Sequence, residues 1–283
     1  MIHFISNHNI NSIGVCNYLT DAAKILSINH FWSKKPELFF YDSSFVLKVD
    51  DGDIDNFNYK KINTKCALWL IDSHTDINRA LAISQNFDFV FCAQKNAVEI
   101  LKSYGISCSW LPLACDSNFH TSIYQELKER PFDVGFSGST DNCGGWNNSR
   151  PKFLESIKSN FKNHLILRGN KGQNTIINGS CKIIVNQNVN NDINMRFFEA
   201  VSAGSVVVTP QIKDNGFDKF EKSSSVFVYE NYDEAIDMIK YAIDNINSLE
   251  KSAKDLSTLY KQKHSYAKRL EQIIYWSSVH NKT

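Results

Sequence analysis

Short apolar runs alternate along the chain with segments of helical spacing. Residues 66–71 (CALWLI) and 205–208 (SVVV) carry no charge, which is typical of parallel strands that are covered on both faces. Residues 18–29 instead place apolar side chains three and four positions apart, as in an amphipathic helix. Short loops with glycine separate many of these segments. This α/β alternation predicts doubly wound parallel sheets, and a length of 283 residues suggests two such domains.

The segment 192–210 (DINMRFFEAVSAGSVVVTP) predicts a short helix, a glycine turn and a buried strand. On a helix Asp192, Arg196 and Glu199 share one face, and the opposite face is apolar. We expect Asp192 to cap the helix and Gly204 to end it. Two interpretations stay open. The charged face is either a solvated surface stripe or part of a site in which the free N–H groups of the helix start bind phosphate.

A polar loop follows the strand at 66–71, and ligands bind at the carboxyl ends of strands in doubly wound sheets. The intrinsic pKa of histidine suits proton transfer near neutral pH. His74 is therefore a candidate base, which Asp72 and Asp76 could orient. The alternative is that Asp72 or Ser73 caps a helix and that His74 is merely exposed.

Two basic segments of the second half are candidates for phosphate binding. A glycine- and asparagine-rich loop at 138–150 ends at Arg150, and Pro151 suits the first turn of a helix. A flexible loop, a cation and a helix start together predict a seat for a diphosphate. Arg168 and Lys171 follow the next strand, where phosphate oxygens would be expected. The alternative for this pair is a surface turn.

Charge and composition exclude several classes of protein. A net charge of +1 offers no basic groove for nucleic acid and no polybasic membrane anchor. The apolar runs are far too short for a membrane span, and the N-terminus does not resemble a signal peptide. Seven cysteines without a C-x-x-C pair indicate a reduced, cytoplasmic protein. The first strand is not followed by G-x-G-x-x-G, which argues against a dinucleotide enzyme.

The acidic stretch at 50–55 contains Asp51, Gly52 and Asp53, a spacing found in some metal-binding loops. Two carboxylates two positions apart are a weak indication of a metal site, because cations such as Ca²⁺ need more oxygen ligands. We therefore expect a solvated turn and no metal site.

Residues 194–210 (NMRFFEAVSAGSVVVTP) resemble the donor-site signature of GT-B glycosyltransferases, and more narrowly that of the CgeB-like spore-maturation branch. Three further stretches resemble the same branch in the same order. They are the link between its domains (110–120), the first strand and turn of its second domain (132–139) and its closing helix (264–274). The resemblance implies the GT-B fold, in which two doubly wound Rossmann-like domains face a cleft.

The resemblance also implies a domain organisation and a reaction. Residues 1–120 would form the acceptor-side domain, residues 121–263 the donor-binding domain, and residues 264–283 a helix that packs back on the first domain. A contact with the membrane surface is an alternative role for this helix. The reaction would move a sugar from an activated donor, expected to be a nucleotide-diphosphate sugar, to a hydroxyl group of a glycan or lipid-linked acceptor in polysaccharide biosynthesis. No nucleic acid, metal or cofactor is expected.

Individual residues take expected roles from this resemblance. Glu199 would accept hydrogen bonds from a hydroxyl pair of the donor. Asp192 stands seven positions earlier, where retaining relatives usually carry a glutamate, and it would be a catalytic carboxylate. His74, beside Asp72, would be the base or a sugar contact. The other expected donor-binding residues are Ser139, Arg150, Arg168, Lys171, Asn194 and Arg196.

Three alternatives remain at this point. Two are enzymes on the same fold: a transferase that uses a non-nucleotide phosphosugar donor, and a sugar-nucleotide epimerase. The third is a non-catalytic, two-lobed protein that binds a sugar or nucleotide.

Overall fold

A computed structural model describes most of the chain. The described residues are 1–7, 14–35, 43–53, 57–116, 125–142, 149–169, 173–213 and 215–279. The chain divides into two compact units. Unit 1 combines Met1–Leu113 with Tyr266–Thr283, and unit 2 is the continuous segment Ala114–Ser265.

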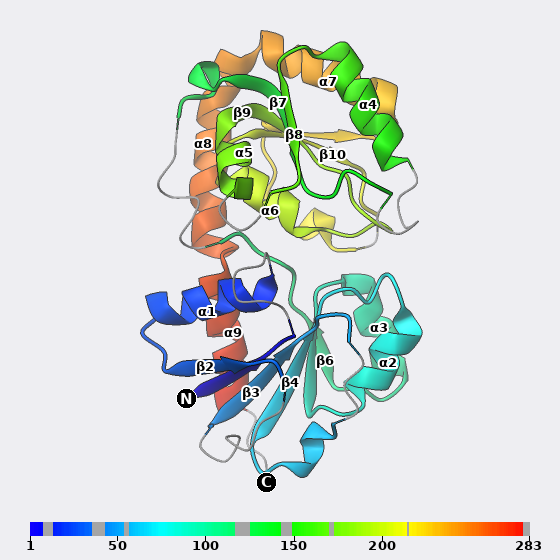
Figure 1. Ribbon diagram of the computed structural model, residues 1–283, viewed down its shortest axis with the longest axis vertical. Coiled ribbons are helices and arrows are strands. Elements are labelled where there is room, and N and C mark those ends of the chain that lie inside the picture. The colour runs from blue at the N-terminus through cyan, green and yellow to red at the C-terminus, as the bar shows by residue number, and fades with distance from the viewer. Residues whose placement is uncertain are drawn as a thin grey trace. The chain divides into compact units, whose positions relative to one another are not determined.

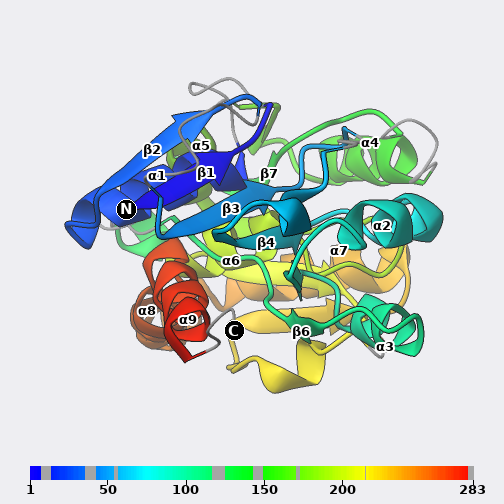
Figure 2. The same ribbon diagram turned by 90° about the horizontal axis from the view of Figure 1, so that it is seen from below.

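Unit 1 is built on a six-stranded parallel sheet in the order β2-β1-β3-β4-β5-β6, which Figure 2 shows running from β2 past β1, β3 and β4 to β6. Its strands are β1 (Ile2–Ile5), β2 (His30–Ser33), β3 (Phe45–Val49), β4 (Lys65–Leu70), β5 (Phe89–Cys92) and β6 (Cys108–Trp110). Its helices are α1 (Val15–Ile25), η2 (Tyr59–Lys61), α2 (Ile77–Ser84), α3 (Lys95–Ser103) and α9 (Tyr266–Val279). Helices α1 and α9 cover one face of the sheet, and α2 and α3 cover the other (Figure 1).

Unit 2 is built on a five-stranded parallel sheet in the order β11-β10-β9-β7-β8. Its strands are β7 (Phe132–Ser137), β8 (His164–Leu167), β9 (Cys181–Val185), β10 (Val206–Pro210) and β11 (Val226–Tyr229). Its helices are η4 (Leu127–Glu129), α4 (Arg150–Asn160), α5 (Gln173–Ser180), α6 (Met195–Ser202), η5 (Phe217–Lys219), α7 (Tyr232–Asp244) and α8 (Ile246–Lys263). The prediction of two doubly wound, Rossmann-like α/β units is confirmed.

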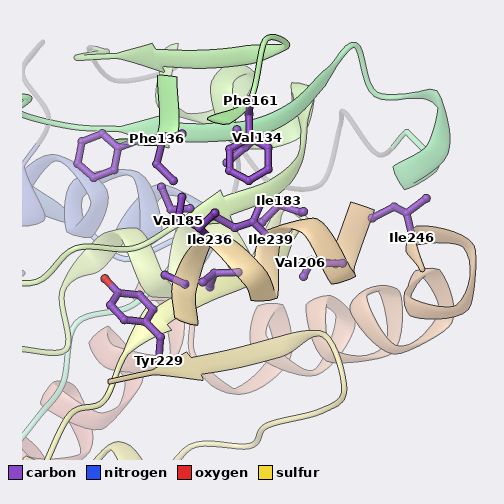
Figure 3. Close-up of a cluster of buried hydrophobic side chains, with 14 of the residues drawn as sticks. Val134, Phe136, Phe161, Ile183, Val185, Val206, Tyr229, Ile236, Ile239 and Ile246 are labelled. Carbon is purple, nitrogen blue, oxygen red and sulfur yellow. The ribbon is translucent and has the colours of Figure 1, made fainter. Parts of the chain in front are cut away.

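Each unit has its own core, because each sheet carries apolar side chains on both faces. In unit 2 Val134, Ile183 and Val206 come from three neighbouring strands and meet Ile236 and Ile239 of α7 (Figure 3). In unit 1 a corresponding cluster lies between the central strands and helices α2 and α3.

Helix α9 completes unit 1 from the far end of the chain. Its first residue, Tyr266, is fully buried and stacks on Tyr18 of α1, with 5.0 Å between the ring centroids. Trp69 of β4 lies 6.1 Å from the same tyrosine ring. Among the described residues, no helix combines the length and apolar character needed to cross a bilayer.

The strand order fixes where a ligand can bind. In each sheet the chain starts at an inner strand, adds one neighbour and then continues on the other side. The direction of winding therefore reverses between β1 and β3 in unit 1 and between β7 and β9 in unit 2. In open α/β sheets ligands bind beside the carboxyl ends of the strands at such switch points.

Candidate functional site

Arg196 spans the switch point of unit 2. It projects from α6, and its Nε donates a hydrogen bond of 2.5 Å to the carbonyl oxygen of Ser137, the last residue of β7. Its Nη1 donates to the carbonyl oxygen of Gln187 (2.9 Å) and to Oδ1 of Asn186 (3.1 Å), both just past β9. The guanidinium carbon lies 4.1 Å from the ring centroid of Phe136, within the range of a cation–π interaction.

Arg150 approaches the same place from α4. It is the first residue of that helix and is 3% exposed. Its two terminal nitrogens donate to the carbonyl oxygens of Ser139 (3.3 Å) and Gln187 (3.1 Å). Arg150 and Arg196 thus converge on one carbonyl oxygen, that of Gln187. Two guanidinium groups therefore bring positive charge to this partly buried edge of the sheet.

Gly138 makes this arrangement sterically possible. Its φ of +145° is rarely adopted by residues with a side chain. A Cβ atom at this position would lie 2.3 Å from Nη2 of Arg196, well inside van der Waals contact. The glycine turn predicted after the first strand of the second domain is therefore required by the close approach of Arg196.

Helix α6 begins two residues later than we expected. Its cap is Asn194, whose Oδ1 accepts a hydrogen bond from the backbone N–H of Phe197 (3.3 Å) and whose Nδ2 donates to the carbonyl oxygen of Gln187 (3.1 Å). The predicted capping role of Asp192 is wrong, because the chain is still in a turn at that residue.

The interpretation of a solvated charged stripe is also wrong. Asp192 is 6% exposed and Glu199 is 2% exposed, so both carboxylates are buried in unit 2. A buried carboxylate must be balanced by hydrogen bonds or a nearby positive charge. Neither carboxylate is therefore part of a water-exposed stripe.

The remaining predicted donor-binding residues lie around this edge or outside the described residues. The hydroxyl of Ser139 donates to Asp141 (2.7 Å), while its carbonyl oxygen accepts from Arg150. Arg168 is exposed and follows β8, the outer strand next to β7. Lys171 lies outside the described residues.

A polar pocket of about 480 Å³ lies beside the two arginines. It is lined by residues at the carboxyl ends of β9, β10 and β11 and at the starts of α4 and α7, among them Ser149, Gln187, Asn190, Glu230, Asn231 and Tyr232. At its base the hydroxyl of Tyr229 donates to the carbonyl oxygen of Asn186 (3.2 Å) and accepts from the side chain of Gln187 (3.0 Å). Burial raises the pKa of Tyr229, so this hydroxyl stays protonated.

Sequence analysis did not identify this pocket. Gln187, Tyr229 and Tyr232 come from separate segments, and no short motif joins them. Their shared position, just past strand ends on one side of a switch point, is the signal that could have indicated it.

In unit 1 His74 and Asp72 share a turn directly after β4. His74 is half-buried, and the neighbouring Ser73 is 2% exposed. The hydroxyl of Ser73 donates to Oε1 of Gln94 (2.8 Å). The cap of α2 is Asp76, which accepts from the backbone N–H of Arg79 (3.0 Å), so the alternative that Asp72 or Ser73 provides the cap is wrong.

The acidic stretch after β3 is only in part the solvated turn that the sequence predicts, because Gly52 and Asp53 are exposed but Asp50 is buried. The side chain of Asp51 is 1% exposed, and its Oδ2 accepts from Nζ of Lys48 (2.7 Å) and from the backbone N–H of Asn7 (2.6 Å). Asp53 accepts from Nδ2 of Asn7 (2.5 Å). In the part of the chain that the structure describes, no group of three or more His, Cys, Asp or Glu side chains is arranged to hold a metal ion.

Comparison with known proteins identifies the family. A family model described as "Glycosyl transferase-like" matches residues 118–275, more than half of the chain. No curated protein matches the chain by sequence.

Solved structures resemble the chain over nearly its whole length. HepE from Anabaena, in complex with UDP and glucose, gives a TM-score of 0.68 at 12% identity, with 99% of each chain covered. Sucrose-phosphate synthase from Thermosynechococcus elongatus gives 0.66 at 9% identity, with 98% of each covered. An α-glucosyltransferase in complex with UDP-glucose and DNA containing an abasic site gives 0.64 at 8% identity, with 98% of each covered.

Identities this low establish the fold alone, and the fold is that of the GT-B glycosyltransferases. The family match supplies the activity. The chain belongs to the glycosyl transferase-like family and is a glycosyltransferase of the GT-B fold.

Proposed function

We propose that unit 2 binds a nucleoside-diphosphate sugar at the carboxyl edge of its sheet and that the sugar is transferred to a hydroxyl group of a glycan or lipid-linked acceptor. The observation that carries this proposal is the convergence of Arg150 and Arg196 on the carbonyl oxygen of Gln187, beside a polar pocket of about 480 Å³. A diphosphate needs positive charge, and the nucleoside attached to it needs a pocket of this kind.

The donor would lie with its nucleoside in the pocket and its diphosphate beside the two guanidinium groups. Arg168 and Lys171 would add positive charge near β8, and Glu199 would accept hydrogen bonds from donor hydroxyl groups. Charge that develops on the leaving diphosphate would then be stabilised by side chains and by the backbone near Asn194, without a metal ion. The complexes of HepE with UDP and glucose and of the α-glucosyltransferase with UDP-glucose support a donor of this class.

Unit 1 would supply the acceptor side. We propose residues 1–120 as the acceptor-side domain and residues 121–263 as the donor-binding domain. His74 would accept the proton of the acceptor hydroxyl, and Asp72 would help to orient it. We assign the chain to the CgeB-like branch on the four resembling stretches. We also propose a cytoplasmic location, because the six described cysteines are all buried and free, as suits a reducing compartment.

The donor site can be tested by titrating UDP, GDP and ADP into the wild-type protein and into the variants Arg196→Gln and Arg196→Lys. Loss of a charge-assisted hydrogen bond of about 1.5–3 kcal/mol corresponds to roughly 10- to 150-fold weaker binding, so Arg196→Gln should bind its preferred nucleotide that much more weakly. Arg196→Lys keeps the charge and should lose less.

The matched control is Lys222→Gln. Lys222 is another cation over a phenylalanine ring in the same unit, with Nζ 4.2 Å from the ring centroid of Phe217, but it lies outside the carboxyl-edge pocket. Its removal should leave nucleotide affinity unchanged. If Arg196→Gln binds each of the three nucleotides as tightly as the wild-type protein does, the proposed donor site is contradicted. Binding of a phosphosugar but of no nucleotide would favour a non-nucleotide donor.

The base can be tested with His74→Ala. General-base catalysis contributes about 10²- to 10⁴-fold, so turnover should fall by that factor while donor affinity, measured without acceptor, stays the same. A weaker donor affinity with unchanged turnover would make His74 a sugar contact.

Activity should also persist in EDTA, and loss of turnover that Mn²⁺ or Mg²⁺ restores would contradict the metal-independent mechanism.

A further inference from the structure

We propose that Asp50 is a positioning residue for catalysis, because it fixes the turn that carries His74. This inference rests on the proposed role of His74 as the base. Asp50 immediately follows β3 and is not part of the turn itself. Sequence analysis gave it no role.

The carboxylate of Asp50 joins three parts of unit 1. Its Oδ2 accepts from the backbone N–H groups of Ile71 (3.2 Å) and Asp72 (3.3 Å), the first two residues after β4. Both of its oxygens accept from the guanidinium of Arg79 on α2, each at 2.9 Å. The Asp50 side chain is only 1% exposed, so water cannot substitute for these donors.

The rest of the turn is held by hydrogen bonds within the turn and by one to the segment after β5. The backbone N–H and the hydroxyl of Thr75 both donate to the carbonyl oxygen of Asp72 (3.1 and 2.8 Å), and Ser73 donates to Gln94. The backbone on both sides of His74 is thereby fixed. Asp50 attaches the start of the turn to the end of β3, and Ser73 attaches its middle to the segment after β5, so Asp50 is one of two side-chain links that set where His74 lies relative to the carboxyl edge of the sheet.

Asp50 also contributes charge. Burial acts to raise its pKa, but the bonds from Arg79 and from backbone N–H groups outweigh burial and hold the pKa below its usual range. The carboxylates of Asp72 and Asp76 face the same guanidinium and, with Asp50, raise the pKa of Arg79. Three carboxylates against one cation leave the turn net negative.

The neighbouring Asp51 provides a matched control. It is equally buried, at 1% exposure of the side chain, and it is also paired with a cation, Lys48. Lys48, Asn7 and Asp53 donate hydrogen bonds to it, and none of these residues lies in the turn at 71–76. Asp51→Asn therefore breaks a comparable ion pair without releasing the turn.

The experiment compares Asp50→Asn, Asp51→Asn, His74→Ala and the double variant Asp50→Asn/His74→Ala, with kcat, donor affinity and the pH profile of kcat measured for each. A misplacement of about 1 Å can cost about 10²-fold in rate, so Asp50→Asn should lower kcat by about 10- to 100-fold. Its donor affinity should not change. Asp51→Asn should keep the wild-type pH profile and a kcat within about threefold of wild type, because its effect is on stability.

The double variant identifies the route of the effect. If Asp50 acts through His74, Asp50→Asn/His74→Ala should be no slower than His74→Ala alone, since residues that act as a unit are non-additive. If Asp50→Asn does not fold, Asp50→Glu keeps the charge but moves the carboxylate by one methylene group. It should show reduced kcat with normal donor affinity.

Two outcomes overturn the inference while leaving the base assignment intact. In the first, His74→Ala is slow but Asp50→Asn has wild-type kcat and pH profile. In the second, the fold-loss of kcat in the double variant equals the product of the losses in the two single variants. Wild-type turnover in His74→Ala is a different result, because it removes the base assignment itself and with it the premise for Asp50.

Discussion

At the residue scale, Gly138 sets how closely the loop after β7 can approach a cation. Its φ of +145° disfavours any residue with a side chain, and an added Cβ, 2.3 Å from Nη2, would also displace the end of the Arg196 side chain. The glycine therefore affects stability and ligand binding together.

Gly138→Ala should destabilise unit 2 by about 1–3 kcal/mol, the usual cost of a strained backbone conformation, and displace Arg196. Nucleotide affinity should fall as well. Urea unfolding and nucleotide titration measure the two effects. The control is Gly105→Ala, at φ +74° with no atom within 4 Å of the added Cβ, which should lose stability but keep nucleotide affinity. Full nucleotide affinity in Gly138→Ala would contradict the proposed position of the diphosphate.

Individual residues were predictable where a local motif carries the chemistry. Arg150, Asn194 and Arg196 lie in short segments with recognisable helix starts, and the structure brings all three to the carbonyl oxygen of Gln187. The pair of Asp50 and Arg79 was not predictable. Its partners are 29 residues apart and meet only because β3 and β4 are neighbours in the sheet.

At the element scale, α6 shows why the helix was predictable and its start was not. The apolar face and the glycine after it predict an element that ends near residue 203. Asn190 and Asn191, however, adopt left-handed φ angles of 46° and 62°, and the N–H of Asp192 donates to the carbonyl oxygen of Val189 (3.0 Å). Asp192 closes this turn, so the helix begins later and Asn194 provides the cap.

Asn194→Ala should cost about 1 kcal/mol of stability, the usual loss for a capping side chain. It also removes a donor to the carbonyl oxygen of Gln187, so nucleotide binding should weaken as the loop after β9 loosens. Thermal unfolding with and without nucleotide measures both. Asn58→Ala, which removes the cap of η2 in unit 1, should lower stability without affecting nucleotide binding. An unchanged nucleotide affinity in Asn194→Ala would show that the capping side chain does not contribute to the donor site.

At the scale of the whole molecule, the alternation of strand and helix was sufficient to predict two doubly wound units. It could not give the strand orders, because strand pairing depends on contacts between distant segments. The same limitation explains why the pocket beside the two arginines was not predicted, because its lining residues come from three strand ends and two helix starts.

Tyr266→Ala should destabilise unit 1 selectively. The ring is fully buried and stacked on Tyr18, and replacing a buried aromatic side chain by alanine costs about 3–5 kcal/mol. Calorimetry should show a lower transition temperature for unit 1, while the transition that responds to nucleotide stays in place. Tyr275→Ala, at a position 70% exposed on the same helix, should have little effect. A downward shift of the nucleotide-sensitive transition in Tyr266→Ala would show that the loss of stability is not confined to unit 1 and would contradict this prediction.

The joining of α9 to unit 1 has a consequence for synthesis on the ribosome. Unit 2 is continuous and can fold once residue 265 has emerged, whereas unit 1 still lacks the helix that covers Tyr18 and Trp69. At about 5–20 residues per second, the interval between β6 and α9 lasts roughly 8–30 s. The unit that is translated first is therefore completed last. Through that interval one face of its sheet presents uncovered aromatic side chains to chaperones and to neighbouring nascent chains.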